Sequence, residues 1–360
     1  MSESLAAIFH GAGKNLELRR VSTPRPVATE MVVRVLGCTV CGSDLHSFDG
    51  RRDVAVPTIL GHEIVGEIIR CGDSAPEVDL SGQVLKVGDR VTWAIVASCG
   101  DCFYCRRDLP QKCLASVKYG HELLSPGREL LGGMAEHCLL TAGTSIVRLP
   151  DQLSLEAACP ASCATATIAA AMKVAGDVRD RSVCLFGMGL LGLTATAMMK
   201  VAGAAEIVCV DVDSSRLANA EAFGATSVAH PDELPAVGKS ITGEHGFDVV
   251  LELSGSSAAV ETGWNMMRIG GTLILVGSVF PGPPVSMAPE RIVRRNLTIR
   301  GIHNYCPKDL VNAVEFLAAH HQEFPFDDLV KQWFSLEDAE RAFSMSSDPG
   351  NIRVGIRPAH

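Results

Sequence analysis

The chain has 360 residues, 47% of them hydrophobic and 20% charged, which allows ordinary buried cores and excludes a disordered or fibrous protein. At about 150 residues per domain, this length predicts roughly two domains. The formal net charge is −9 and the acidic residues are spread along the chain, so we expect no nucleic-acid partner and no electrostatic docking to a membrane.

The N-terminal residues contain neither a basic segment nor an apolar core, which argues against a signal peptide. The longest uncharged stretch, 183–199, is too short for a membrane span and is interrupted by three glycines. We interpret it as a buried strand, a turn and a helix. We therefore expect a cytoplasmic protein that does not interact with membranes.

The first 160 residues contain short strand-like runs separated by Gly and Pro, for example 31–36, 63–70 and 90–93. This pattern predicts an irregular and mostly antiparallel β domain. After residue 164, apolar runs of strand length alternate with helical stretches, such as 190–201 and 214–223. The runs lie at 183–186, 207–210, 227–229, 249–253, 273–276 and 297–299.

Six strands joined by crossover helices predict a doubly wound parallel sheet of the Rossmann type. The tail, from about residue 303, returns to helix and ends in a short strand near 353–356. The overall expectation is an α/β protein in which a β-rich domain is interrupted by, or packed on, a Rossmann unit.

The sequence holds 13 cysteines, a large and odd number for a cytoplasmic chain. Disulfides are unstable in a reducing compartment, so metal ligation or catalysis is the better explanation. Five isolated cysteines are expected to be small hydrophobic residues of the core: Cys71, Cys138, Cys184, Cys209 and Cys306.

Four cysteines gather in one short segment, at Cys99, Cys102, Cys105 and Cys113. Two-residue gaps let the first three thiolates turn toward one ion, and a longer loop returns the fourth. Four thiolates close a tetrahedron around Zn²⁺ and leave no open position, so the spacing predicts a structural zinc site. An iron–sulfur cluster is the alternative metal group, and core cysteines without a metal are the second alternative.

A second set of metal-ligand residue types begins with Cys41 and continues with His62. A thiolate, an imidazole and a third ligand would leave the fourth zinc position open for water or substrate, as in a catalytic site. Cys163 is the third candidate, with Cys159 as the alternative.

The segment Gly187-Met-Gly189-Leu-Leu-Gly192 matches a dinucleotide-binding loop. It follows a predicted strand, opens a predicted helix, and precedes Asp211 by 19 residues from its last glycine. These features are what the pattern requires if the pyrophosphate binds at the helix N-terminus and the acid binds the ribose. The charge of Asp211, reinforced by Asp213, should repel a 2′-phosphate and so favours NAD over NADP.

Four motifs in this order resemble the zinc-dependent medium-chain alcohol dehydrogenase family over nearly the whole chain. They are the Cys-Gly-Ser-Asp-x-His segment from Cys41, the Gly-His-Glu at His62, the four cysteines and the glycine-rich loop. The resemblance implies a GroES-like β-rich catalytic domain (1–164 and 303–360, with a zinc lobe at about 97–115) and a Rossmann NAD-binding domain (165–302). It also implies two zinc ions per chain, and a homodimer or homotetramer.

By the same resemblance, Cys41, His62 and Cys163 ligate the catalytic zinc, and Glu63 approaches it when water leaves. Asp44 would orient a ligand, and Ser43 and His46 would relay the proton of the alcohol. The implied cofactor-binding residues are Gly187, Gly189, Leu190, Leu191, Gly192, Asp211, Arg216, Val276 and Arg353. Gly42 stands where some members have an arginine that binds the pyrophosphate, so that contact is absent here.

The predicted activity is NAD-dependent oxidation of a primary or secondary alcohol to an aldehyde or ketone. The segment 112–122 resembles alcohol dehydrogenases associated with phosphonate catabolism, so Lys118, His121 and Arg128 could bind a hydroxyalkylphosphonate. Polyols, threonine-like amino alcohols and simple secondary alcohols stay open as substrates. A non-catalytic NAD-binding redox sensor is the alternative from a different functional class.

Overall fold

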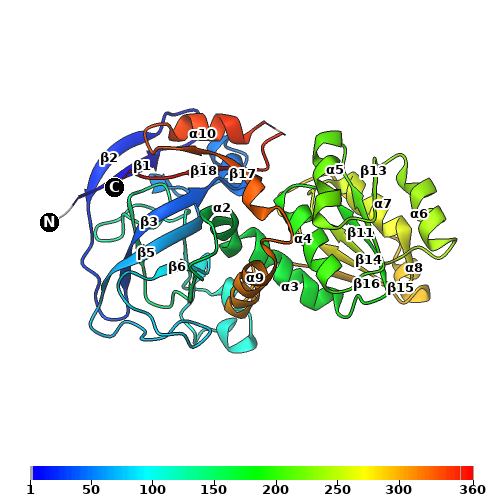
Figure 1. Ribbon diagram of the computed structural model, residues 1–360, viewed down its shortest axis with the longest axis horizontal. Coiled ribbons are helices and arrows are strands. Elements are labelled where there is room, and N and C mark those ends of the chain that lie inside the picture. The colour runs from blue at the N-terminus through cyan, green and yellow to red at the C-terminus, as the bar shows by residue number, and fades with distance from the viewer. Residues whose placement is uncertain (1–2, 349, 360) are drawn as a thin grey trace. The chain divides into compact units, whose positions relative to one another are not determined.

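A computed structural model of the chain describes residues 3–348 and 350–359. The chain divides into two compact units (Figure 1). The terminal unit comprises Met1–Ala166 and Cys306–His360, and the central unit comprises Thr167–Tyr305. The domain boundaries expected from the sequence, after residues 164 and 302, lie two and three residues from these positions.

The terminal unit is built on a sheet whose strands run in the order β10-β6-β5-β3-β18-β17, with β9 also paired to β3. Its pairings are antiparallel except for β17 with β18, which agrees with the mostly antiparallel domain predicted from the sequence. The strands of this sheet are β3 (Met31–Thr39), β5 (Glu63–Cys71), β6 (Arg90–Trp93), β9 (His137–Leu140), β10 (Ile146–Arg148), β17 (Val330–Phe334) and β18 (Arg353–Ile356).

Two smaller sheets and several helices complete the terminal unit. The smaller sheets contain β1 (Glu3–Phe9), β2 (Glu17–Ser22) and β4 (Thr58–Ile59), and β7 (Val96–Ala97) with β8 (Val117–Lys118). The α-helices are α1 (Gly42–Phe48), α2 (Leu155–Ala158), α9 (Pro307–His320) and α10 (Ala339–Ser346), and α3 (Ala164–Ala175) leads into the central unit. The 3₁₀ helices are η1 (Cys105–Arg107), η2 (Pro110–Lys112), η3 (Cys159–Ser162) and η5 (Phe326–Leu329).

The end of the chain returns to the first large strand and shapes the site described below. In β18, Ile356 pairs with Cys38 of β3, and the N–H of Val40 donates to the carbonyl of Val354 over 2.9 Å. This pairing brings Arg353 to the start of β5, because β3 and β5 are antiparallel neighbours and Thr39 lies opposite Glu63.

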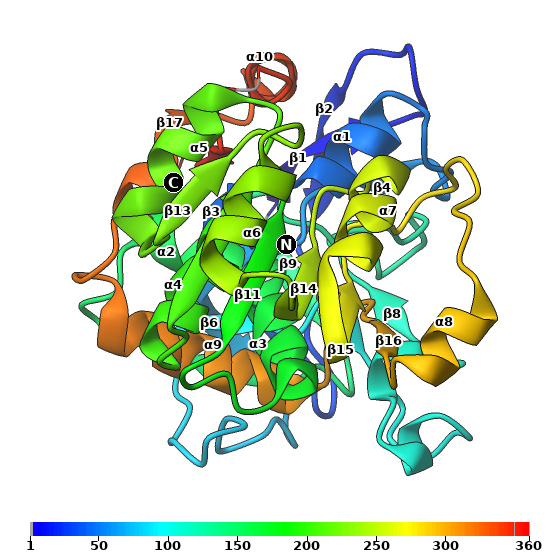
Figure 2. The same cartoon turned by 90° about the vertical axis from the view of Figure 1, so that its right-hand side faces the viewer.

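The central unit contains the six-stranded sheet that the sequence predicts, in the order β13-β12-β11-β14-β15-β16, with every pairing parallel. Figure 2 shows β11, β14 and β15 side by side. The strands are β11 (Ser182–Phe186), β12 (Glu206–Val210), β13 (Ser227–Ala229), β14 (Phe247–Glu252), β15 (Met267–Leu275) and β16 (Thr298–Gly301). The helices are α4 (Leu190–Val201), α5 (Ser214–Ala220), η4 (Glu221–Phe223), α6 (Leu234–Thr242), α7 (Ser257–Met266) and α8 (Pro289–Arg294).

Helices cover both faces of this sheet. Side chains that alternate along the strands contact helices on opposite faces. Phe186 and Val250 face α7, where Gly263 allows close approach. Cys209 points to the opposite face and meets Thr196 of α4, with 3.2 Å between Sγ and Oγ1. Strands buried on both faces are nearly continuously apolar, and this explains the runs that identified them in the sequence.

Three expectations from the sequence are corrected. Cys71 is exposed, because it is the last residue of β5, where the strand leaves the sheet. Cys306 is half-buried just before α9, beside the carbonyl of Asp108, and is not a core residue. The strand expected at 273–276 begins earlier, at Met267. Its first half was not predicted, because Gly270 and Gly271 interrupt the apolar run.

Across the residues that the structure describes, no single helix is long and apolar enough to cross a membrane. Leu155–Ser162 and Ala164–Ala175 reach that length and composition only as a pair bent by 58°.

Candidate metal centres and nucleotide loop

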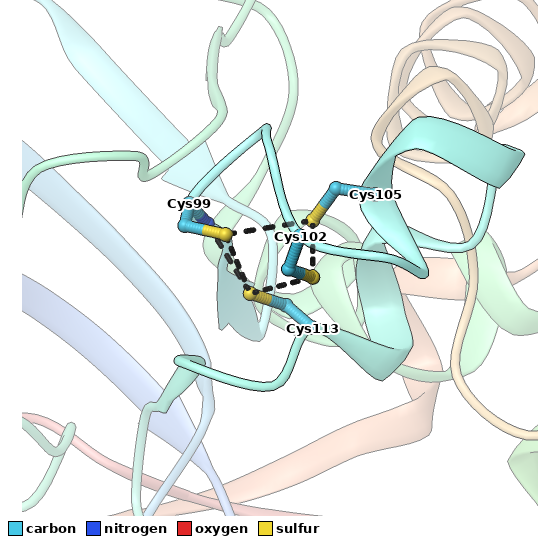
Figure 3. Close-up of side chains that lie close together, drawn as sticks. All are labelled: Cys99, Cys102, Cys105 and Cys113. Carbon is cyan, nitrogen blue, oxygen red and sulfur yellow. Dashed lines mark hydrogen bonds between the residues drawn. The ribbon is translucent and has the colours of Figure 1, made fainter.

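The four clustered cysteines converge in the loop that carries η1 and η2 (Figure 3). Their Sγ–Sγ distances are 3.4 Å for Cys99–Cys113, 3.5 Å for Cys102–Cys105, 3.9 Å for Cys102–Cys113 and 4.0 Å for Cys99–Cys105. Four sulfurs at about 2.3 Å from a central ion would be about 3.8 Å apart, so this geometry fits a closed tetrahedral zinc site.

Backbone N–H groups support the negative charge that metal binding requires. Donors at Leu114 and then Cys105 lower the pKa of Cys102 to about 6. The N–H of Cys99 donates to the Sγ of Cys113 over 3.3 Å. Thiolates, not thiols, bind metals, so these contacts prepare the site for an ion.

A second cluster, here called the Cys41 cluster, consists of Cys41, His62 and Cys163. Their ligand atoms all lie within 4.8 Å of one another, and the two Sγ atoms are 3.9 Å apart. Cys41 precedes α1, His62 precedes β5, and Cys163 lies between η3 and α3. The structure thus brings Cys163 to the other two residues, whereas Cys159 is buried against Gly37. Two thiolates and one imidazole leave a fourth position open to an incoming oxygen.

Asp44 is completely buried and contacts the segments that carry Cys41 and His62. Its Oδ2 accepts the N–H of Cys41 at 3.0 Å, and its Oδ1 accepts the N–H of Gly61 at 3.2 Å. Oδ1 also lies 3.2 Å from the Nδ1 of His62. This contact turns the Nε2 of His62 toward the sulfurs, which is the arrangement that orients a metal-binding histidine.

The charges around Cys41 are strongly coupled. A hydrogen bond from the thiol of Cys163 is the main cause of the lowered pKa of Cys41. Burial opposes protonation of His62, but the carboxylate of Asp44 outweighs it and raises the pKa of His62 to about 10. Binding of a cation would therefore displace a proton from His62.

Glu63 and Arg353 form a buried ion pair at the edge of the Cys41 cluster. The Nε and Nη2 of Arg353 each lie 3.1 Å from a carboxylate oxygen of Glu63, and Nη2 lies 3.7 Å from the Sγ of Cys41. Thr39 donates its hydroxyl to the same carboxylate. The sequence predicted that Arg353 binds the cofactor pyrophosphate. The structure places it on Glu63, and the pyrophosphate contact stays a prediction.

Ser43 and His46 lie three residues apart on α1, and so on one side of that helix. The Oγ of Ser43 is 3.3 Å from the Nε2 of His62. Burial, followed by the charge of Arg51, lowers the pKa of His46, so its ring is neutral at pH 7 and can accept a proton.

Two cations near the Cys41 cluster complete its surroundings. Burial lowers the pKa of Lys118 to about 8, with the charge of Arg52 as the next cause. Burial also lowers the pKa of Arg52, while Asp44 and then Cys41 raise it. Lys118 was singled out in the sequence, but no motif or spacing marked Arg52. Arg128 is exposed, and no contact in the described ranges links it to the cluster.

The glycine-rich loop has the geometry that a dinucleotide needs. Gly187 has φ +96°, and a Cβ there would lie 2.8 Å from the backbone nitrogen of Ser254. A Cβ on Gly192 would lie 2.0 Å from the carbonyl oxygen of Gly187. Gly189 is the N-cap residue of α4, and a Cβ there would meet nothing within 4 Å. The loop therefore leaves open space at the helix N-terminus, where a pyrophosphate binds.

The acid expected at the ribose is in place at the end of β12. Asp211 is buried, and its Oδ2 accepts the N–H of Met188 at 2.6 Å, which ties it to the glycine loop. Asp213 instead caps α5, where it accepts the N–H of Ser215. The other expected cofactor residues lie in the same unit: Leu190, Leu191, Arg216 and Val276.

Comparisons with known proteins cover both units. The alcohol dehydrogenase GroES-like domain matches residues 27–151, and the zinc-binding dehydrogenase domain matches residues 191–319. An alcohol dehydrogenase from Geobacillus stearothermophilus is 32% identical over 320 residues, which cover 87% of this chain and 88% of that protein.

Two further similarities extend over almost the full length. A D-arabitol-phosphate dehydrogenase from Enterococcus avium is 29% identical over 344 residues, covering 93% of this chain and 92% of that protein. The crystal structure of an alcohol dehydrogenase from Thermotoga maritima matches with a TM-score of 0.94 and 26% identity, and covers 100% of both chains.

Proposed function

The chain belongs to the zinc-dependent medium-chain alcohol dehydrogenase family and acts on alcohols with zinc and a nicotinamide cofactor; from this we propose a specific site, cofactor and substrate class. The Cys41 cluster is the catalytic zinc site, and the four-cysteine site is structural. The observation that carries this proposal is the convergence of Cys41, His62 and Cys163 with one ligand position left open.

The proposed reaction transfers a hydride from the carbinol carbon to NAD⁺ and releases one proton, which yields an aldehyde or ketone and NADH. Zinc, when bound, supplies a Lewis acid that favours deprotonation of the alcohol oxygen. The nicotinamide supplies the hydride acceptor. The chain itself positions these groups and moves the proton.

Ser43 and His46 are proposed to carry that proton. The hydroxyl of Ser43 lies beside the Nε2 of His62, at the open side of the cluster. It can accept a proton from the substrate hydroxyl and donate its own to the neutral ring of His46, one helical turn away. Glu63 is held by Arg353, and its carboxylate is then available next to the ligands without adding an unpaired buried charge.

NAD is proposed over NADP because of Asp211. Its buried carboxylate sits where the adenosine ribose would bind, at the end of the second strand of the sheet. A 2′-phosphate placed there would face a fixed negative charge. The kcat/KM with NAD should therefore exceed the kcat/KM with NADP at least tenfold. Asp211→Asn should reduce this preference for NAD.

For the substrate, we propose a hydroxyalkylphosphonate, with a phosphorylated polyol as the second candidate. The first rests on the segment 112–122 and on the place of Lys118 near the cluster. The second is favoured by the similarity to a D-arabitol-phosphate dehydrogenase. Both carry an anionic group together with an oxidisable hydroxyl.

The test is NADH formation by the zinc-loaded protein with a panel of alcohols. The panel contains 2-hydroxyethylphosphonate, D-arabitol 5-phosphate, D-arabitol, L-threonine and 1-propanol. Turnover with the phosphonate above all others supports the first candidate, and turnover with the sugar phosphate supports the second. Preference for D-arabitol, threonine or 1-propanol would keep the dehydrogenase and discard both substrates.

A further inference from the structure

Two chain segments outside the ligand set border the Cys41 cluster. Arg52 follows α1, and its backbone N–H donates to the carbonyl of His46 over 3.0 Å. Lys118 ends β8, two residues before Gly120, whose Cβ position would lie 2.8 Å from the carbonyl oxygen of Gly61. These backbone contacts hold both segments against the residues that carry the cluster.

The side chains of Arg52 and Lys118 are half-buried cations without an acidic partner. In the part of the chain that the structure describes, neither forms a hydrogen bond or ion pair through its charged group. Both are sensitive to the charges of Asp44 and Cys163, and Lys118 is sensitive to Arg52. Arg353 is the useful contrast, because its buried guanidinium is neutralised by Glu63. Burying an unpaired cation is costly, so such a pair needs another explanation.

The local charge balance leaves a positive surplus. Two thiolates in the Cys41 cluster match the charge of one Zn²⁺, and Glu63 matches Arg353. The single charge of Asp44 then faces the two charges of Arg52 and Lys118. A bound anion would offset this surplus and accept hydrogen bonds from the guanidinium and ammonium groups, for which the described residues provide no acceptor.

His121 lies at the same place but has a different role. Its ring lies tilted by 41° to that of His62, with 5.4 Å between the ring centroids. Its Nδ1 lies 2.8 Å from the carbonyl oxygen of Tyr119, and since a carbonyl only accepts, Nδ1 carries the proton. In the neutral ring, the buried Nε2 is then an acceptor, and it has no partner among the described residues. His121 is thus suited to a hydroxyl group and not to an anion.

We propose that Arg52 and Lys118 bind an anionic group of the alcohol substrate, a phosphonate, phosphate or carboxylate, and so select anionic alcohols over neutral ones. This inference rests on the proposed function, since it places the anion beside the oxidised hydroxyl. The inference adds Arg52 to the proposed substrate site. A guanidinium can make a planar, bidentate contact with such anions, whereas the ammonium of Lys118 supplies a point charge.

The first test compares three substrates in four proteins. The substrates are 2-hydroxyethylphosphonate and its neutral counterpart 1-propanol, with 3-hydroxypropanoate as the carboxylate arm. The proteins are the wild type, Arg52→Gln, Lys118→Gln and the control Lys86→Gln, which removes one exposed cation from the same unit. We expect kcat/KM for the preferred anion to fall roughly 10- to 100-fold in the first two variants, as for the loss of a charge-assisted hydrogen bond. We expect the ratio of kcat/KM for the anion to that for 1-propanol to fall by a similar factor in these two variants, and less than a twofold change in the control.

The second test measures binding without turnover. Ethylphosphonate lacks the hydroxyl, so its affinity for the zinc- and NAD-loaded protein by calorimetry reports the anion site alone, with inorganic phosphate as a second probe. Binding by the wild type that is weakened at least tenfold in Arg52→Gln and in Lys118→Gln supports the inference.

The outcomes separate this inference from the proposed function. Turnover of 1-propanol without preference for any anion, and without binding of ethylphosphonate, overturns the anion site and leaves the dehydrogenase. Binding of ethylphosphonate that depends on Arg52, without turnover of any alcohol, supports the anion site and contradicts the proposed function.

Discussion

At the scale of single residues, Asp44 organises the Cys41 cluster. Its carboxylate contacts the N–H of Cys41, the N–H of Gly61 and the ring of His62. These three contacts join the start of α1 to the start of β5, so one side chain fixes two ligands. Asp44 was predicted to orient a ligand, and in the structure it also caps α1 while it contacts the ring of His62.

We therefore predict that Asp44→Asn weakens binding of the catalytic zinc by roughly 10- to 100-fold, because the amide is a poorer partner for the imidazole of His62. Competition with a chromophoric chelator measures this affinity. Asp49→Asn is the matched control, since Asp49 ends the same helix and pairs with exposed Arg51. Equal zinc affinity in Asp44→Asn and the wild type would show that Asp44 does not orient the ligand.

Lys118 gives a second prediction, in pH dependence. Its pKa is lowered to about 8, so the ammonium is charged below this pH and neutral above it. Arg52 and Lys112 favour its neutral form, whereas Cys163 and Asp44 favour its charged form. The groups on its own segment are Glu122, which accepts its backbone N–H, and His121.

The ratio of kcat/KM for 2-hydroxyethylphosphonate to that for 1-propanol should consequently fall as pH rises through about 8. Taking the ratio removes the pH dependence of hydride transfer that both substrates share. In Lys118→Gln the ratio should be low and flat over the same range. A ratio that stays constant in the wild type from pH 7 to 9 would contradict a role for this lysine.

At the scale of elements, each of the three glycines in the turn from β11 to α4 has a different structural role. Gly187 needs a positive φ, and Gly192 allows α4 to pack on the turn. Gly189 has neither constraint, so its open side is available to the cofactor. The spacing of these glycines, together with the strand before them and the helix after them, predicted the turn, because its geometry is local.

Alanine substitutions should separate these roles. Gly192→Ala places a methyl group 2.0 Å from the carbonyl oxygen of Gly187 and should destabilise the fold by about 1–3 kcal/mol. Gly189→Ala should leave the unfolding temperature unchanged and weaken NADH binding at least tenfold. Thermal unfolding and NADH fluorescence measure the two effects. A Gly189→Ala protein that binds NADH normally would show that the cofactor does not approach this position.

The four-cysteine lobe is the second element whose role can be tested alone. It contains little regular structure beyond η1 and η2, and Phe103, Tyr104, Leu109 and Leu114 are exposed. A core therefore cannot hold it, and we expect a bound metal to be the main source of its order.

Cys113→Ser should leave this segment open to trypsin at Arg106, Arg107 and Lys112, while the central unit keeps its affinity for NADH. The rate of cleavage, followed by mass spectrometry, is the measurement. Cys71→Ser replaces an exposed thiol elsewhere in the terminal unit and should cleave as slowly as the wild type. Equal protection of Cys113→Ser would mean that no metal holds the lobe.

At the scale of the whole molecule, features formed by residues close together in the sequence were predictable. Contacts between residues far apart in the sequence were not. The parallel sheet was predictable in type and in number of strands, because each strand is an apolar run followed by its own helix. Motifs also predicted the residues that converge in the Cys41 cluster and in the four-cysteine cluster. The approach of Arg353 to Glu63 was not predictable, because it depends on β18 pairing with β3 more than 300 residues away.

Arg52 was missed for a related reason. It stands in the exposed-looking run Gly50-Arg51-Arg52-Asp53, where nothing distinguishes it from Arg51. Only the folded chain separates them, since Arg51 is exposed and pairs with Asp49, whereas Arg52 is half-buried and has a pKa that burial lowers and the charges of Asp44 and Cys41 raise. The selection of Cys163 over Cys159 likewise depended on the turn at η3, which moves one thiol into the site and buries the other.

Zinc content measured together with turnover tests most directly whether the Cys41 cluster is the catalytic zinc site. Wild-type protein should contain two zinc ions per chain and form NADH from an alcohol of the panel. Cys41→Ala should retain one zinc ion and its affinity for NADH, yet lose at least a thousandfold in kcat, because only the open metal site is removed. A Cys41→Ala protein that still holds two zinc ions, or that turns over at the wild-type rate, would contradict the assignment of the Cys41 cluster as the catalytic centre.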